Sequence, residues 1–507
     1  METVVEINDA ANGFVWGTFG LALLIGTGLI CTVITAFFQV RHLKHWWKNT
    51  FGLIRDKARI INDAGALSQF RTFCTALCAV IGTGNIAGVS TAICVGGPGA
   101  VLWMWVAAFF GMMLKYSEIV LGMFYRRRNS VGAWSGGPMY YLQDGFGSKK
   151  HGRRFGKLLA VLFCIFTVLA SFGIGNMAQI NKITINVQSS FLSDVESETF
   201  LGASKVNWGI GLFLMVAMMV ILIGGFRRVA AVSEKIIPLM SILYILGCVI
   251  MIFIHINQIP AAFSAIFKFA FGTDAAIGGA AGTAVQLAFI TIKNGCKRGV
   301  FSNEAGLGSS VMVHTNSCSR EPVHQGMWGI AEVFLDTIVI CTLTALVVLT
   351  SGAIDLNTGL ALEGVNDSTL VTKAFGATFG APGEWFVVLM ITLFAFTTVL
   401  GWSYYGAKAT EYLFGVLSAK VYRVIFVLII ILGALMGSNL AWDISDTFNG
   451  LMMIPNLVGI LVQIPLIIKL TRNYIDRRIK GKDVMPMLSY NADIQKEAIS
   501  AIAKGAD

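Results

Sequence analysis

The sequence predicts an all-α protein with many membrane-spanning helices, and three observations support this fold class. Hydrophobic residues make up 55% of the chain and charged residues only 13%, against about 25% charged in ordinary soluble domains. The mean hydropathy is +0.71. Apolar runs of about 20 residues, the length that crosses a bilayer as a helix, recur along the whole chain. We therefore expect a polytopic membrane protein without a separate soluble domain.

Eleven apolar segments are long enough to span a membrane. The first thirteen residues are acidic and lack the basic stretch that opens a signal peptide, so the first segment is expected to remain as a span. The polar chain from residue 469 onward is expected to form an amphipathic or disordered tail. The predicted spans are 14–40, 68–93, 99–124, 157–188, 207–224, 236–257, 276–296, 325–350, 385–412, 423–439 and 447–468.

Basic residues indicate the orientation in the membrane. Of the 38 Lys and Arg residues, 32 lie in alternate connections and in the tail, whereas the opposite connections hold Lys205, Lys268 and Lys373 among acidic residues. The positive-inside rule then places the N-terminus outside and the C-terminus in the cytoplasm of a cell with this protein in its plasma or inner membrane. The net charge of +10 is thus explained by topology, and no nucleic-acid partner is expected.

Cysteines and histidines do not indicate a metal or redox centre. The nine cysteines form no Cys-x-x-Cys pair and lie mostly inside spans, where cysteine behaves as a small apolar residue. The six histidines show no spacing typical of metal ligands. No organic cofactor is expected.

A polar, glycine-rich stretch, IGTGNIAG, interrupts the second span at residues 81–88. Its GxGxxA pattern indicates a dinucleotide loop only between a strand and a helix, and here the flanks are apolar. Close helix packing would explain Gly84 and Gly88 but not the rest of the stretch. A discontinuous helix explains all of it, because a break frees N–H groups that suit a carboxylate and carbonyl oxygens that suit a small cation.

Broken helices of this kind occur in transporters built from two inverted repeats, which predicts a second break in the other half. If the first span is an addition, the other ten divide into five plus five, at 68–257 and 276–468. The second half then opens with AAIGGAAG at residues 275–282, as the repeat requires. The predicted organisation is an N-terminal helix with a basic loop (1–67), two inverted five-helix repeats with discontinuous helices, and a cytoplasmic tail (469–507).

Four motifs carry a family resemblance. They are GGPGAVLWMWVAAFFGMMLKYSE (Gly96 to Glu118), SGGPMYYL (Ser135 to Leu142), GIGNMAQ (Gly173 to Gln179) and RGVFSNEAGLGS (Arg298 to Ser309). With these motifs the chain closely resembles the alanine/glycine:cation symporter family over most of its length. The resemblance implies a five-plus-five repeat like that of the leucine-transporter superfamily, and import of alanine or glycine with sodium.

The resemblance also implies a substrate site at the first break. The backbone N–H groups of Thr83 and Gly84 would hold the substrate carboxylate, with the Thr83 hydroxyl nearby. Asn85 would either touch the substrate or an ion directly or only steady the unwound turn. Gln179 on the fourth span would reach the substrate through its amide, although by itself such a residue is typical of an interhelical hydrogen bond. The other substrate candidates are Asn176, the backbone carbonyls of Gly278 and Gly279 in the second break, Thr398 and Trp402.

The implied sodium site joins the first break to the ninth span. The carbonyl oxygens of Cys78 and Ile81 would face the ion, because a hard cation requires oxygen ligands. Thr397 and Thr398 are the candidate hydroxyl ligands, together with the Phe394 carbonyl. The alternative for adjacent threonines in a span is a hydroxyl bonded back to the carbonyl of the preceding helical turn.

Trp402 is expected to limit the size of the substrate. It follows Thr398 by four residues and therefore lies on the same helical face. An indole at this position would leave room only for a methyl group or a hydrogen. The alternative, an interfacial belt tryptophan, fits less well because Trp402 lies well inside the span.

Ionisable residues within spans are functional candidates by default. Lys115 and Glu118, three residues apart, are expected to pair on one helical face as a structural contact. Glu332 and Asp336 lie four residues apart, and both a structural network and a gate or proton relay are open interpretations.

The connection FSNEAGLGSS, residues 301–310, differs from the basic loops on the same predicted side. It is small and polar, which indicates a gate element at the inner end of the substrate path. Asn303 and Glu304 are its expected polar contacts.

The broken helices predict a secondary active transporter that works by alternating access, and the resemblance implies that it couples sodium entry to uptake of alanine or glycine. Its partners would be a small amino acid and the lipid bilayer. An enzyme is not indicated, because no nucleophile, base or metal cluster converges. A proton-coupled permease using Glu332 and Asp336 is the alternative, and a passive channel would need a continuous polar pore that two separate breaks do not indicate.

Overall fold

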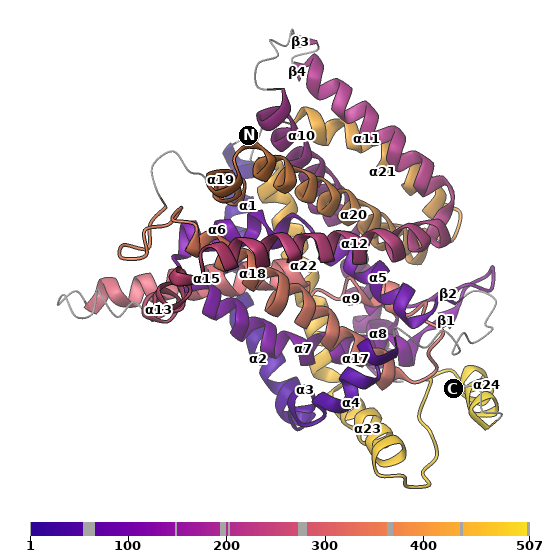
Figure 1. Ribbon diagram of the computed structural model, residues 1–507. Helices are drawn as coiled ribbons and strands as arrows, with labels where there is room; N and C mark the ends of the chain where they lie inside the picture. Colours follow the sequence, from indigo (N-terminus) through magenta and orange to yellow (C-terminus); the bar gives the residue numbers. More distant parts are fainter. Residues whose placement is uncertain are drawn as a thin grey trace.

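The computed structural model describes residues 2–53, 66–147, 150–192, 199–200, 203–271, 281–361, 369–436 and 440–503. The described chain is a bundle of helices with two small hairpins at its surface (Figure 1). The N-terminus and the C-terminal helix lie toward opposite ends of the bundle in this view.

The helices of the N-terminal half are α1 (Glu2–Val15), α2 (Thr18–Ile34), α3 (Phe38–Arg41), α4 (Leu43–Lys48), η1 (Phe51–Leu53), α5 (Gln69–Val80), η2 (Thr83–Asn85), α6 (Ala87–Gly96), α7 (Ala100–Tyr125), α8 (Pro138–Gly145), α9 (Lys150–Phe172), η3 (Gly173–Met177), α10 (Ala178–Phe191), α11 (Lys205–Ile223), α12 (Gly225–Ile254), η4 (Ile256–Gln258) and α13 (Ile259–Phe269).

The helices of the C-terminal half are α15 (Ala281–Asn303), α16 (Val311–His314), α17 (Pro322–Val333), η5 (Phe334–Cys341), α18 (Thr342–Thr350), α19 (Leu370–Phe379), α20 (Ala381–Phe414), α21 (Ser418–Leu435), α22 (Leu440–Val462), α23 (Ile464–Tyr474), η6 (Ile475–Ile479) and α24 (Ala492–Ala503). The antiparallel hairpins pair β1 (Arg127–Arg128) with β2 (Trp134–Ser135) and β3 (Thr199–Phe200) with β4 (Ala203–Ser204).

The predicted all-α polytopic class is confirmed. Eight helices of the described chain are long and apolar enough to cross a membrane, and two bent helix pairs raise the number to ten. These ten match ten of the predicted spans in order. The remaining predicted span, 276–296, begins outside the described residues, and α15 covers its later part.

The first span lies earlier in the chain than predicted. Residues Val5–Ile34 form it as α1 and α2, rather than residues 14–40. It ends at Ile34 because Ala36 and Phe37 have φ angles of 55° and 56°, which a right-handed helix excludes. Trp16 donates to the Asp446 carbonyl at 3.1 Å, and this contact holds the end of α1 against α22.

The tail is more regular than predicted. The last span continues through α23 to Tyr474 after a 64° bend, so residue 469 lies inside a helix. Farther along, the Tyr490 N–H donates to the Phe124 carbonyl at 2.9 Å, and the rings of Tyr490 and Tyr125 lie 5.0 Å apart between centroids. These contacts fasten the chain before α24 to the end of α7.

The second span is broken where the glycine-rich stretch predicts it. The helix α5 begins after Ser68, whose hydroxyl accepts the Arg71 N–H at 3.2 Å, and it ends at Val80. Gly82 is extended, with φ −142° and ψ −157°, and η2 then leads into α6 at an angle of 64° to α5. The predicted matching break at 275–282 falls almost entirely on residues 272–280, which lie outside the described residues.

The broken span lies in the interior of the bundle. The helix α5 packs against α12 and α20, while α6 packs against α15, and all three residues of η2 are buried. Irregular backbone at membrane depth requires such a position, because lipid offers no hydrogen bonds to free N–H and C=O groups.

Candidate functional site

The Asn85 side chain holds the break in shape. Its carbonyl oxygen accepts the Gly82 N–H at 2.8 Å, and its amide nitrogen donates to the Asp336 carboxylate at 2.5 Å. Because Gly82 donates to a side chain, its N–H does not reach the Cys78 carbonyl, which would be its partner in a continuous helix. The break therefore leaves carbonyl oxygens at the end of α5 available for other contacts.

A small buried cavity lies directly beside the break. Its volume is about 20 Å³, enough for roughly one water molecule. Six residues proposed from the sequence line it together, from four separate elements: Thr83 and Gly84 of the break, Gln179 of α10, Thr398 and Trp402 of α20, and Glu304 after α15. The apolar part of the lining includes Ile174 and Phe301. An amino acid is larger than this space, so the site in the described conformation is closed to a substrate molecule.

Gln179 is turned toward the break by an irregular stretch of its own helix. A π-helical turn, η3, precedes α10, and the Gln179 amide nitrogen donates to the Ile174 carbonyl within this region at 3.1 Å. The amide oxygen accepts the Thr83 hydroxyl at 2.9 Å. Gly175 is required here, because a Cβ atom at this position would lie 2.5 Å from the Cβ of Trp402.

The oxygen atoms proposed for sodium meet where α5 approaches α20. The Thr398 hydroxyl donates to the Phe394 carbonyl at 2.9 Å and lies 3.4 Å from the Ile81 carbonyl. A Cβ atom on Gly82 would overlap this hydroxyl, so glycine permits the approach. Three of the proposed oxygen ligands thus converge on one point, and the Cys78 carbonyl belongs to the same helix end.

Thr397 lies differently from Thr398. Its hydroxyl donates to the Phe394 carbonyl at 3.0 Å and lies 3.8 Å from the Met240 sulfur, away from the cavity lining. Its carbonyl accepts the Cys78 thiol at 2.9 Å. Both threonines therefore make the back-bonded contact considered from the sequence, but only Thr398 also faces the break.

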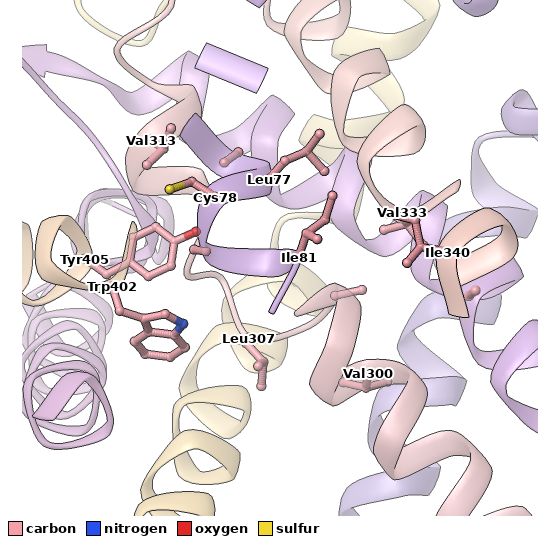
Figure 2. Packing of buried hydrophobic residues seen from close by; sticks show 14 of the residues in the cluster. Leu77, Cys78, Ile81, Val300, Leu307, Val313, Val333, Ile340, Trp402 and Tyr405 are labelled. Carbon is pink, nitrogen blue, oxygen red and sulfur yellow. The ribbon is translucent and has the colours of Figure 1, made fainter. Parts of the chain in front are cut away.

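Figure 2 shows Cys78 and Ile81 at the end of α5, with the rings of Trp402 and Tyr405 approaching this segment from α20. The two rings lie 5.4 Å apart between centroids, in an edge-to-face arrangement. This packing fixes the indole beside the cavity rather than at a membrane interface.

Three of the residues proposed for the substrate or the gate lie outside the cavity lining. The Asn85 amide binds Gly82 and Asp336, the Asn176 amide donates to the Phe426 carbonyl at 2.7 Å, and the Asn303 amide donates to Thr337 at 3.0 Å. Gly278 and Gly279 lie outside the described residues.

The two proposed contacts of the segment 301–310, Asn303 and Glu304, have different surroundings. Asn303 closes the end of α15, since its side-chain oxygen accepts the Ala305 N–H at 2.9 Å. Glu304 has a φ of 54° and turns into the cavity lining, where the Ser309 hydroxyl donates to its carboxylate. The positive φ is strained for a glutamate, and such strain is typical of functional segments.

A buried network of ionisable residues lies behind this segment. Lys115 lies 3.2 Å from Glu332, which also binds His314 at 2.7 Å, whereas the predicted partner Glu118 accepts from Asn456 at 2.6 Å. The predicted pairing of Lys115 with Glu118 was therefore wrong, because the Glu118 carboxylate accepts the Gly308 N–H at 3.2 Å and the Asn456 amide, whereas the lysine pairs with Glu332.

Glu332 and Asp336 have different surroundings. Glu332 is neutralised by its basic neighbours, but Asp336 forms no ion pair with any described residue. It accepts hydrogen bonds from Asn85, from Ser302 at 3.1 Å and from Thr337 at 2.8 Å. The sequence interpretation did not single out Ser302.

Asn449 also lines the cavity and was not foreseen. It is a polar residue within the last span, on α22, and amides at membrane depth are candidates in general. Its single occurrence without a motif gave no reason to prefer it over other buried amides.

The chain is similar over nearly its whole length to known proteins. The sequence model of the sodium:alanine symporter family matches residues 1–487. The chain is 39% identical over 470 residues to the sodium/alanine symporter AgcS of Methanococcus maripaludis, covering 93% of this chain and 97% of that protein. It is 32% identical over 492 residues to the probable sodium/glutamine symporter GlnT of Bacillus subtilis, covering 95% and 93% of the two chains.

Similarity to a solved structure supports the fold alone. The structure of MhsT in complex with L-phenylalanine matches with a TM-score of 0.51 and 15% identity, covering 88% of this chain and 98% of that one. The named relatives are transporters and not enzymes. With a family match across nearly its whole length, the chain belongs to the sodium:alanine symporter family.

Proposed function

We propose that this protein imports alanine or glycine together with sodium, moving the substrate across the cell membrane by alternating access. The observation that carries the proposal is the convergence, at one buried cavity, of the helix break, the Gln179 amide and the Thr398 hydroxyl. This arrangement supports an anion site beside a cation site, as a zwitterion accompanied by sodium would require.

The substrate carboxylate would be held by the break. The N–H groups of Thr83 and Gly84 precede α6, and the partial positive charge at this helix start favours an anion. The Thr83 hydroxyl and the Gln179 amide now bind each other at 2.9 Å, and both would turn toward the substrate. The ammonium group would meet the carbonyls of the second break, at Gly278 and Gly279.

The aromatic wall would set the size of the substrate. Trp402 and Phe301 line the cavity, so when the site opens to admit an amino acid their rings would stand against the substrate side chain and favour a hydrogen or a methyl group. Relatives are named for alanine and for glutamine, so substrate size differs between the proteins that this chain resembles. A small neutral amino acid fits this site better than a larger one.

Sodium would couple to the substrate through the helix break that they share. The ion would be bound by the carbonyls of Cys78, Ile81 and Phe394 and by the Thr398 hydroxyl. Ile81 directly precedes the break, so an ion at this point would hold the break in the shape that binds a carboxylate. Each ligand would then raise the affinity for the other, as linkage requires.

Entry and release would occur from opposite faces, with the N-terminus outside and the basic loops inside. The segment 301–310 would act as the inner gate, because Glu304 lies in the cavity lining and its backbone is strained. Movement of this segment would open the closed cavity toward the cytoplasm.

Transport by the purified full-length protein in liposomes tests the proposal. Under an inward sodium gradient we expect labelled alanine to accumulate inside the liposomes above its external concentration. Unlabelled glycine should compete with this uptake, and uptake should stop when choline replaces sodium. Uptake that only equilibrates would indicate a channel and would contradict the proposal. Protein-free liposomes in the same gradients serve as the control.

Proton coupling is the second candidate function, and Asp336 is the observation that favours it. Its buried carboxylate forms no ion pair within the described chain, so a proton could balance its charge. Glu332, the other acid of the pair, is already paired with Lys115 and His314. Uptake driven by a pH gradient in sodium-free liposomes would select this candidate over sodium coupling.

A further inference from the structure

A groove lies between α11 and α21 on the outside of the bundle. The two helices run side by side in Figure 1 and are in contact. Near one end they touch closely, since a Cβ atom on Gly211 would lie 2.8 Å from the Cβ of Ala434. Toward the other end they separate around a cavity of about 420 Å³. It is lined by Met215, Met219, Leu222, Ile223, Lys420, Arg423, Val424, Val427 and Leu428.

The walls of this groove are apolar and open to the surroundings of the bundle. Ile223 is 77% exposed, Val424 62% and Leu428 57%. Both helices are apolar enough to span a membrane, so these side chains face lipid rather than water. The volume lies within the roughly 300–1,000 Å³ range typical of ligand sites.

Two basic residues close the wider end of the groove. Lys420 and Arg423 lie one helical turn apart in the first turns of α21, and neither forms an ion pair with a described carboxylate. Arg227 and Arg228 lie close by in the first turn of α12, so this end carries a surplus of positive charge. The nearby Glu411 is bound to Lys408 at 3.0 Å.

We propose that this groove binds an anionic phospholipid, with an acyl chain between α11 and α21 and the phosphate at Lys420 and Arg423. Basic pockets between membrane helices at the cytoplasmic surface are suited to acidic headgroups, and the inner leaflet supplies them. The basic loops that predict the cytoplasmic side include this end of the groove. The proposal is independent of which amino acid or ion is transported.

Arg423 also lines a second cavity, of about 380 Å³, on the same end of the bundle. This cavity is lined by Asn316, Tyr404 and Phe226 among others. The Tyr404 ring stacks on Phe226 at 3.8 Å between centroids, and its hydroxyl accepts from Asn316 at 2.7 Å. Arg423 and Tyr404 line the same cavity, and Tyr404 lies two residues after Trp402 on α20. A phosphate bound to Arg423 would therefore sit next to the helix that also lines the substrate cavity.

Lipid retention by the full-length protein tests this site. The protein is incubated with vesicles of phosphatidylglycerol and phosphatidylcholine, and retained lipid is counted by native mass spectrometry. The double variant Lys420→Gln and Arg423→Gln is expected to bind phosphatidylglycerol about 30-fold more weakly, about fivefold for each lost charge. Leu428→Trp, which fills the groove without a change of charge, is expected to displace the lipid as well.

Arg41→Gln with Lys44→Gln is the matched control, since it removes two charges from α3 and α4 on the same predicted side. This variant should retain phosphatidylglycerol as the wild type does. Wild-type retention in both groove variants would overturn the proposal. So would displacement of the lipid by inorganic phosphate alone, which indicates a simple anion site, or a dimer that Leu428→Trp dissociates, which indicates a second copy of the chain in the groove.

Discussion

The Asn85 amide nitrogen lies 2.5 Å from the Asp336 carboxylate, which joins the broken second span to the eighth span. The same amide accepts the Gly82 N–H through its oxygen at 2.8 Å. One buried side chain therefore links an acidic residue on η5 to the backbone that opens the break. The break is held from outside its own helix, and its shape depends on the position of Asp336.

Asp336→Asn is expected to lower both thermal stability and sodium-driven alanine uptake. The variant replaces a charge-assisted hydrogen bond in a buried site, worth about 1.5–3 kcal/mol, by a neutral one. Thermal unfolding in detergent and initial uptake rates in liposomes measure the two effects. Thr337→Val is the comparison variant, because it removes a different bond to the same carboxylate, together with the acceptor of the Asn303 amide, and leaves the Asn85 contact in place. It should reduce stability with a smaller loss of uptake than Asp336→Asn. Normal uptake in Asp336→Asn would show that this contact does not position the break.

Thr398→Val is expected to raise the sodium concentration for half-maximal uptake by roughly tenfold or more, which corresponds to about 1.4 kcal/mol. The variant removes the hydroxyl that lies between the Ile81 and Phe394 carbonyls. Thr397→Val makes the same chemical change one residue earlier, where the hydroxyl lies beside Met240, and should have a smaller effect. Sodium titration of alanine uptake compares the two. Equal shifts in both variants would contradict a specific role of Thr398.

Trp402→Ala is expected to widen the range of accepted substrates. The variant removes an indole from the cavity lining, so serine, valine and leucine should compete with labelled alanine more strongly than they do in the wild type. Tyr405→Phe keeps the neighbouring ring, 5.4 Å from Trp402, and should leave the competition profile unchanged. An identical profile in Trp402→Ala would remove the indole from the determinants of substrate size.

Lys115→Met is expected to destabilise the fold strongly, by about 3–5 kcal/mol, because it leaves the buried Glu332 carboxylate with His314 as its one remaining basic neighbour among the described residues. Glu332→Gln should also destabilise, since it leaves Lys115 unpaired. The double variant is expected to be more stable than either single variant, because both charges are then absent. Thermal unfolding of the three proteins in one detergent measures the coupling. Additive losses in the double variant would show that the two residues do not act as a pair.

Part of the candidate site follows from local sequence. Gly82, Thr83 and Gly84 break the helix because glycine and short polar residues at that density do not sustain one, and the structure has the break at the same residues. The side-chain direction of Gln179 was inferred from the family motif, and the π-helical turn before it provides the physical reason. The sequence offered no such signal for Asn449 or Ser302, because a single polar residue in a span has many possible neighbours.

The amino-acid sequence by itself determined the polytopic class, the order of the spans and the position of the first break, because these depend on hydropathy and backbone preference over neighbouring residues. Only the tertiary structure decided which distant groups meet. Asn85 binds Asp336 although 251 positions separate them in the chain. Lys115 pairs with Glu332 rather than with Glu118, which lies three residues away in the sequence. Such pairings depend on how helices pack and rotate against one another, which a linear pattern does not specify.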